Sequence, residues 1–233
     1  MKTLLLFLCL CATVPTSAQD ITWRQWTAEA EHDIRLLPRY GDVVKSPALR
    51  KLDREFVDKI LSQGRTPRMG SAIFIRKGFE LLGTDTKTAM YRFNQAYLLD
   101  STNVDVYRAY ASVYTQLGQL ALAREQYEAG LARDSTNTVL LTEYGIHWFR
   151  EYYTAEFAHE ESSEEVYEKG VFYLLRSYEL DPANPVTTFH LAVHYLKRGA
   201  CDQAWKYHDE SVATGAGVVA PGFTEKLKEE CPR

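Results

Sequence analysis

Hydrophobic and small residues recur at helical spacing between positions 104 and 137. Tyr107, Tyr110 and Tyr114 are three and four residues apart, which places their side chains along one stripe of a helix. Gly118 follows this stripe and is typical of the turn that ends a helix. A second stripe follows and combines small with aromatic residues: Ala123, Tyr127 and Gly130. The pattern predicts two helices that are joined by a short turn and approach closely at the small residues.

A polar tetrapeptide punctuates this pattern at a fixed interval. DSTN occupies positions 100–103 and again 134–137, an interval of 134 − 100 = 34 residues, and the related stretch LDPANP places Asp181 181 − 134 = 47 residues further on. Asp, Ser, Thr and Asn side chains hydrogen-bond nearby backbone N–H groups and therefore favour turns and helix N-caps. The interval predicts a repeated helical hairpin, with 47 − 34 = 13 extra residues in one unit.

Four hairpins are expected between residues 70 and 214, and they are followed and preceded by less regular flanks. The predicted units are 70–103, 104–137, 138–184 and 185–214, and the third contains an insertion near 150–163 that should extend both of its helices. Residues 19–69 form an N-terminal flanking segment with one helix, and residues 215–233 form a loop and a closing helix. Both flanks suit the task of capping a repeat array.

The unit at 104–137 resembles the tetratricopeptide repeat (TPR) family, whose 34-residue unit is a helical hairpin. The large, small and aromatic positions match, with Tyr107 where Trp is frequent and with Ser101 and Ser135 where a closing Pro is usual. The resemblance implies an all-α, right-handed, TPR-like solenoid of helical hairpins with capping segments at both ends. Flanks and repeats together are similar to small exported TPR proteins of Gram-negative bacteria, a resemblance that supplies no specific biochemical activity.

The N-terminal residues have the features of a secretory signal peptide. Lys2 precedes an apolar run at 4–14, and small residues at Thr16 and Ala18 favour cleavage after position 18, so residues 1–18 should be removed. The run is shorter than the about 20 apolar residues that span a bilayer. Since no second such run follows, we expect no membrane insertion of the mature chain and an exported, periplasmic or secreted, location.

The charge of the chain argues against nucleic acid as a partner. The chain has 27 basic and 31 acidic residues, a formal net charge of −4, and loss of Lys2 with the signal peptide would make it −5. A protein that binds a polyanion through bulk charge is basic instead.

Two cysteines remain after the predicted cleavage. In an oxidising compartment an even pair favours a disulfide, which here would join Cys201 to Cys231 across about 30 residues. Two unrelated thiols are the alternative.

Few residues suggest catalysis or metal binding. His190 and His194 lie four residues apart and could share a helix face, yet Leu191 stands where a metalloprotease helix has Glu, and no third ligand follows at a diagnostic spacing. The acidic stretch AHEESSEE lacks the spacing of a calcium loop. Neither a glycine-rich phosphate loop nor a nucleophile elbow occurs. We therefore expect no catalytic residues, no metal and no cofactor.

The TPR resemblance also implies a concave groove that is lined by the first helix of each hairpin. The cation and Asn set with which chaperone-binding TPR proteins hold a peptide carboxylate is missing, and Arg108 matches it only in part. The expected lining changes from polar to apolar along the array, and an extended apolar face needs a cover. The expected groove residues are Asp105, Arg108, Ser112, Thr115, Val139, Thr142, Ile146, Phe149, Val186, Phe189, Val193 and Leu196.

Two covers for this groove follow from the sequence. One is a protein or peptide partner with apolar anchors toward the C-terminal half, and the other is the protein's own N-terminal tail around Trp23 and Trp26. We expect an exported, non-catalytic TPR interaction module or scaffold. The alternatives are a structural subunit of an envelope assembly and a metal-binding or enzymatic protein that uses His190 and His194.

Overall fold

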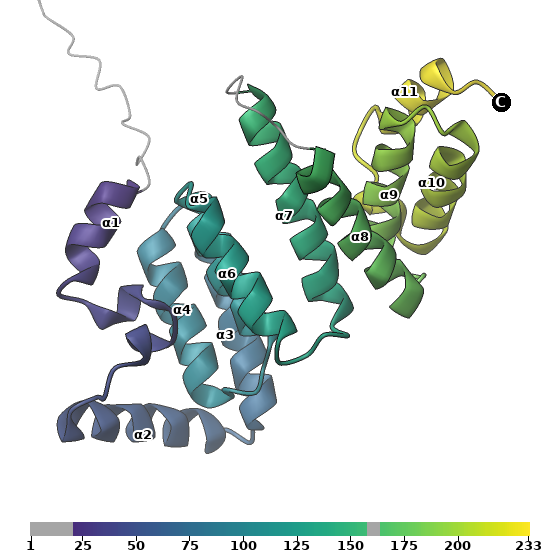
Figure 1. The fold of residues 1–233 in the computed structure, drawn as a ribbon. Helices are drawn as coiled ribbons and strands as arrows, with labels where there is room; N and C mark the ends of the chain where they lie inside the picture. The colour runs from purple at the N-terminus through teal and green to yellow at the C-terminus, as the bar shows by residue number, and fades with distance from the viewer. Residues whose placement is uncertain (1–20, 158–163) are drawn as a thin grey trace, which may run out of the picture.

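The computed structural model describes residues 21–157 and 164–233, and within these ranges the chain is all-α, without a strand. This confirms the expected all-α class; the predicted signal peptide at 1–18 lies outside the described residues. The α-helices of the described ranges are α1 (Trp23–Ala30), α2 (Pro47–Leu61), α3 (Pro67–Leu81), α4 (Thr86–Leu99), α5 (Asp105–Gln116), α6 (Leu120–Leu131), α7 (Thr138–Phe157), α8 (Glu164–Leu180), α9 (Pro185–Lys197), α10 (Cys201–Gly215) and α11 (Phe223–Glu230). Helices α3 to α10 form one curved row, and α2 lies across its edge (Figure 1).

Helices that are consecutive in sequence pack against one another. The most extensive contacts join α3 to α4, α5 to α6, α7 to α8 and α9 to α10, and each of these pairs also touches the next. Contacts also join α3 to α5, α5 to α7 and α7 to α9, so the odd-numbered helices lie side by side. The two helices of the third pair, with the predicted insertion between them, are the longest of the described residues, at 20 and 17 residues. Part of that insertion, 158–163, lies outside the described ranges.

The repeated DSTN tetrapeptide forms the same hydrogen-bonded turn each time. Asp100 Oδ1 accepts a hydrogen bond from the Thr102 backbone N–H at 2.9 Å, and Asp134 Oδ1 accepts one from Thr136 at 3.0 Å. In the second copy the closing Asn caps the next helix, since Asn137 Oδ1 accepts from the Leu140 N–H at 3.0 Å. Asn184 likewise caps α9 by accepting from the Val186 and Thr187 N–H groups. Asn103 precedes the N-cap residue Val104 and accepts a 3.2 Å bond from the first residue of α5, Asp105. The interval in the sequence thus reflects a turn that both ends one helix pair and begins the next.

Glycines allow the long third pair to pack closely. A Cβ atom on Gly145 of α7 would stand 2.9 Å from the backbone oxygen of Gly170 on α8. A Cβ atom on Gly170 would stand 2.6 Å from the ring of Phe149. Because real Cβ atoms do not approach other atoms so closely, both positions require glycine, and the two helices touch through their backbones.

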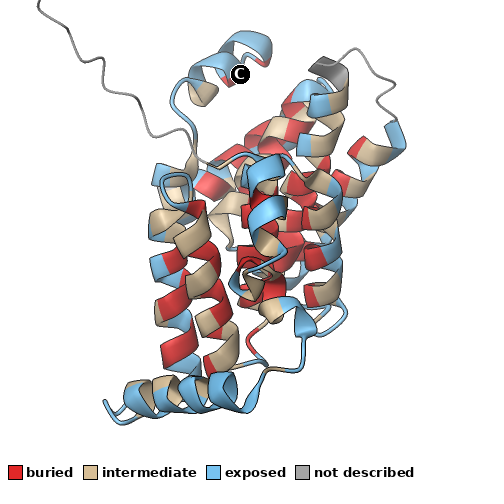
Figure 2. Cartoon of the chain, turned by 90° about the vertical axis from the view of Figure 1, so that its left-hand side faces the viewer, coloured by how far each residue is buried: buried red, intermediate tan, exposed pale blue. Residues whose placement is uncertain are grey.

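The N-terminal segment before α3 is fastened to the side of the array. Trp26 of α1 is 1% exposed within the hydrophobic cluster of α3, α4 and α5. In contrast, α2 has no buried residue, and Figure 2 shows it exposed at the edge of the molecule. Between the two helices, residues 39–42 form a run of left-handed backbone, with φ values of 54°, 60°, 67° and 53°. Left-handed geometry costs a non-glycine residue about 1–2 kcal/mol, so this run needs compensating contacts.

A buried hydrogen-bond network holds that left-handed run. Tyr110 Oη of α5 accepts from the Arg39 backbone N–H at 3.2 Å and donates to Asn94 Oδ1 at 2.8 Å. Asn94 Nδ2 of α4 donates to the backbone oxygens of Arg35 and Leu37 at 2.8 and 2.9 Å. Asn94 and Tyr110 are both fully buried. The network therefore ties α4, α5 and the N-terminal segment together.

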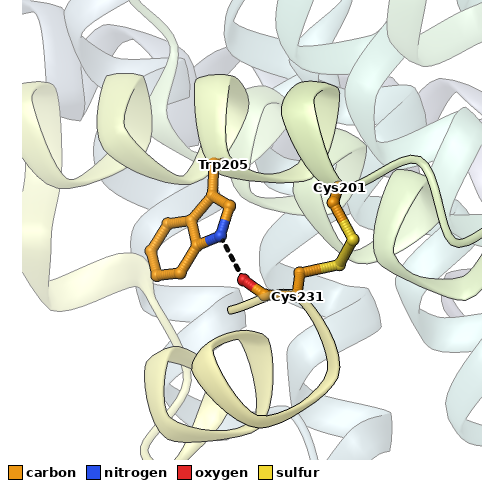
Figure 3. Close-up of a disulfide and its surroundings, with 3 residues drawn as sticks. All are labelled: Cys201, Trp205 and Cys231. Atoms are coloured by element: carbon orange, nitrogen blue, oxygen red, sulfur yellow. Dashed lines mark hydrogen bonds between the residues drawn. A yellow bond between two sulfur atoms is a disulfide. The ribbon is translucent and has the colours of Figure 1, made fainter. Parts of the chain in front are cut away.

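A disulfide holds the C-terminal end, which confirms the predicted pairing. Cys201 at the start of α10 is joined to Cys231 after α11, with Cα atoms 5.3 Å apart (Figure 3). Trp205 Nε1 donates a 2.7 Å hydrogen bond to the backbone oxygen of Cys231, and Arg233 stacks 3.6 Å from the Trp205 ring. Leu227 is buried under this bridge. Without such contacts a helix of eight residues would fray.

Candidate binding groove

A cleft of about 530 Å³ opens between α7 and α9. Its walls are mainly apolar and aromatic, and one charged side chain, Arg150, is among the described residues that line it. The lining residues are Ile146, Phe149, Arg150, Tyr153, Thr154, Tyr167, Phe189, His190, Val193 and His194. A volume of several hundred Å³ with an apolar lining is typical of a ligand or peptide-anchor site.

The aromatic walls of this cleft are held by ring contacts. Phe149 packs against the Tyr167 ring of α8 at 4.9 Å, and the glycine at 170 leaves space for the Phe149 side chain. Phe189 of α9 meets Phe223 of α11 edge to face at 5.2 Å. The closing helix thus supports one wall, so the cleft extends to the disulfide-bonded end of the molecule.

A second, smaller cleft of about 220 Å³ adjoins the first, because Ile146 and Arg150 line both. The second cleft lies between α5 and α7 and is more polar, with Ser112, Thr115 and Glu143 in its lining. Together the two clefts form a groove along α5, α7 and α9 that is polar at the α5 end and apolar at the α9 end. We call this feature the α5–α9 groove.

The structure brings together half of the predicted groove residues. Ile146, Phe149, Phe189 and Val193 line the α7–α9 cleft, and Ser112 and Thr115 line the smaller cleft together with Ile146. Four others line neither cleft. Arg108 forms an ion pair with Glu143 at 3.6 Å and lies 4.5 Å from the centre of the Phe79 ring. The other three are Asp105 and Val186, which are half-buried, and Val139, which is exposed.

The prediction is wrong for Thr142 and Leu196, which are 2% and 6% exposed. Thr142 Oγ1 lies 2.8 Å from Ser177 Oγ and 2.6 Å from Thr187 Oγ1, in a hydroxyl cluster where α7, α8 and α9 meet. Leu196 packs with Trp205 in the cluster under the disulfide. The TPR resemblance implied that both residues face the groove, but contacts with the neighbouring helices bury them instead.

The N-terminal tail does not fill the C-terminal part of the groove with its tryptophans. Trp26 is buried in the cluster of α3, α4 and α5, and Trp23 meets the Tyr114 ring of α5 at 6.3 Å. Neither Trp23 nor Trp26 lines the α7–α9 cleft. The alternative in which these residues cover the apolar floor is therefore wrong.

Sequence reasoning missed the tyrosine and lysine group at the end of the cleft. Lys197 Nζ lies 4.4, 4.6 and 4.7 Å from the ring centroids of Tyr152, Tyr153 and Tyr167. A cation over several aromatic faces is attracted by each ring. The signal was the aromatic pair at 152–153 in the insertion, which extends α7 far enough for its last turns to face α9.

The two histidines of α9 are walls of the cleft. His194 Nδ1 lies 3.0 Å from Tyr167 Oη, and His190 packs edge to face on Phe189. Burial lowers the pKa of each to about 4, and for His194 the nearby Arg198 and Lys197 lower the pKa further. Both imidazoles are therefore neutral near pH 7. In the ranges that the structure describes, no three His, Cys, Asp or Glu side chains are grouped so that they could hold a metal ion.

The tyrosines along the odd-numbered helices belong mainly to the core. Burial raises the pKa of Tyr107 and Tyr114 and raises the pKa of Tyr110 far above its usual value. These phenols stay protonated and act as hydrogen-bond donors or packing groups.

Across residues 21–157 and 164–233 no helix is both long and apolar enough to cross a membrane. No family model matches the chain, and no curated protein matches it either.

Proposed function

We propose that this protein is an exported, non-catalytic interaction module of the TPR type, which binds an extended segment of a partner protein along the α5–α9 groove. One observation carries the proposal: two clefts of about 530 and 220 Å³ share Ile146 and Arg150 and follow the side-by-side odd-numbered helices. Helical repeat arrays bind extended segments along such a face. The partner's apolar anchors would enter the α7–α9 cleft.

The TPR assignment and the right-handed solenoid form part of this proposal. It is supported by the four consecutive helix pairs, by the 34-residue interval between Asp100 and Asp134, and by the Asn137 and Asn184 caps of α7 and α9. Export is proposed from the N-terminal sequence pattern, and the Cys201–Cys231 disulfide agrees with an oxidising compartment.

The test places a charge in the apolar cleft without touching the helix-pair contacts. Ile146→Glu changes a half-buried residue that lines both clefts. A segment anchored there should lose more than about 2 kcal/mol of binding free energy, the size of an interface hot spot. Phe172→Glu is the matched control, because Phe172 on α8 is 61% exposed and lines neither cleft.

A random dodecapeptide library displayed on phage is a suitable probe for both variants. We expect the wild-type protein and Phe172→Glu to enrich a common set of peptides rich in apolar residues, and Ile146→Glu to enrich none of them. Circular dichroism and urea unfolding of each variant establish that the fold persists. If Ile146→Glu retains the wild-type peptides, or if the wild type enriches none, the groove is not a peptide-binding surface.

A further inference from the structure

We infer that the segment bound in the α7–α9 cleft carries an aspartate or glutamate beside its apolar anchor, and that Arg150 binds this carboxylate. The inference rests on the proposed binding function and adds the chemistry of the partner. It starts from Arg150, which lines both clefts and therefore lies at the centre of the α5–α9 groove.

Arg150 differs from the neighbouring arginines in its lack of an acidic partner. Arg108 lies 3.6 Å from Glu143, and Arg124 lies 3.8 Å from Glu151. Arg150 is exposed, and within the described ranges it forms no hydrogen bond or ion pair. Its guanidinium therefore has donors available for a ligand, and a planar guanidinium is well suited to bind a carboxylate.

Lys197 does not line the cleft, but it places a second positive charge next to the tyrosines that do. Its ammonium rests on the Tyr153 and Tyr167 rings, both of which line the cleft. In the described part of the chain no carboxylate lies within ion-pair distance of Lys197. Within residues 21–157 and 164–233, neither of the two cations has an acidic partner.

The cleft has the opposite sign to the chain as a whole. The chain has a formal net charge of −4, yet no aspartate or glutamate is among the described residues that line the α7–α9 cleft. The two histidines in the lining add no charge near pH 7. A binding partner complementary to this surface is therefore apolar where it meets Phe149, Phe189 and Val193, and negative where it meets Arg150.

The position of Arg150 favours a side-chain carboxylate over a chain terminus. Because Arg150 lines both clefts, the α5–α9 groove extends on both sides of it, toward Ser112 in one direction and toward Val193 in the other. A segment that fills the groove runs past Arg150, so the carboxylate comes from within the segment.

Peptide selection with charge-changed variants tests this inference. A displayed dodecapeptide library whose C-termini are fused to the phage coat offers no free terminal carboxylate. We expect the wild type to enrich peptides with Asp or Glu within four residues of an aromatic or aliphatic pair. Arg150→Glu should enrich Lys or Arg at that position instead. Arg176→Gln on α8 is the control, because Arg176 is exposed, pairs with Glu179 and lines neither cleft.

Synthetic peptides then separate this inference from the proposed function. For an enriched peptide, replacing its Asp by Asn should weaken binding to the wild type about 10-fold, the effect of one charged hydrogen bond. The same replacement should leave binding to Arg150→Gln unchanged. If the Asp and Asn peptides bind the wild type equally, the inference is overturned while the groove function stands. If only peptides with a free C-terminus bind, the inference is also overturned. If no peptide depends on Ile146, both fail.

Discussion

The two ends of the helix array are closed in different ways. At the N-terminal end, α1 and the left-handed run at 39–42 are held by a buried network of Asn94, Tyr110 and backbone groups. At the C-terminal end, α11 is held by the Cys201–Cys231 disulfide and by Trp205. The N-terminal closure depends on several weak contacts that must all be present, whereas the C-terminal closure depends mainly on one covalent bond.

This difference predicts which end tolerates change. A hydrogen-bond network in the interior loses more than one bond when a member is removed, because the partners are left buried and unsatisfied. A disulfide acts mainly by restricting the unfolded chain, so its removal leaves the packing of the native end in place.

Asn94→Leu should have the largest effect. The substitution leaves the Arg35 and Leu37 oxygens without their donor and Tyr110 Oη without its acceptor, all at a buried position. We expect the free energy of unfolding to fall by about 4 kcal/mol. Urea unfolding followed by circular dichroism measures this loss.

Two comparisons accompany this variant. Gln203→Leu is its control, because Gln203 is exposed on α10, and it should change stability by less than about 0.5 kcal/mol. Limited proteolysis should cleave Asn94→Leu first within residues 31–46, since the left-handed run would lose its anchor. An Asn94→Leu protein as stable as the wild type would show that the network is not what closes the N-terminal end.

Removal of the disulfide should have a smaller effect. The double variant Cys201→Ala, Cys231→Ala lacks the covalent link between two residues that are 30 positions apart in the sequence. The chain-entropy model makes a loop of this length worth about 3.6 kcal/mol, which should be lost from the free energy of unfolding. Hydrogen-exchange protection should fall further in α11 than in α3 to α5, because α11 can then also open locally. Uniform loss of protection along the chain would contradict the separate closure of the two ends.

The sequence predicts much more of the repeated helix pairs than of the structures that close the two ends. Asp100 and Asp134 make local bonds with residues two positions away, so their effect appears as a short, repeated motif. The bond from Arg39 to Tyr110 spans 71 residues and depends on a left-handed backbone that no local motif signals. The pairing of Cys231 was predictable because the two cysteines outside the predicted signal peptide allow only one pairing. The groove floor was predicted in part, since periodicity places Phe149 and Phe189 on a face but could not place Arg150 between two clefts.

Acidification should weaken the C-terminal half selectively. The pKa of His194 is lowered from 6.5 to about 4 because the imidazole is buried, so the unfolded state binds a proton more readily between these values. The neutral His194 therefore makes its full contribution to the free energy of unfolding above pH 6.5. As the pH falls toward 4, this contribution decreases by on the order of 2 kcal/mol. The N-terminal network of Asn94, Tyr110 and backbone groups has no group that titrates in this window.

His194→Asn isolates the contribution of that imidazole, because an amide does not titrate. Between pH 7 and pH 4 the wild type should lose about 2 kcal/mol more than the variant, as measured by urea unfolding at each pH. His32→Asn, on an exposed histidine of the N-terminal segment, should follow the wild type. Parallel pH profiles for wild type and His194→Asn would mean that the buried imidazole does not carry the pH dependence.

The smallest expected effect lies at two glycines that occupy equivalent turns in the two halves. Gly118 joins α5 to α6 with φ of 72°, and Gly199 joins α9 to α10 with φ of 67°. A Cβ atom at either position would meet no heavy atom within 4 Å, so only the backbone conformation opposes a side chain. Gly118→Ala and Gly199→Ala should therefore each lower the free energy of unfolding by about 1 kcal/mol. Asparagine tolerates left-handed geometry, so Asn at either position should recover part of the loss. Gly199 is two residues from Cys201, and its turn leads directly into the bonded helix. Both substitutions should be compared in the disulfide-bonded protein and in the Cys201→Ala, Cys231→Ala protein. One informative result is that Gly199→Ala lowers the free energy of unfolding clearly more than Gly118→Ala does with the disulfide present, and equally without it. That result would show that the disulfide constrains this turn, and that the C-terminal closure reaches further into the array than α11.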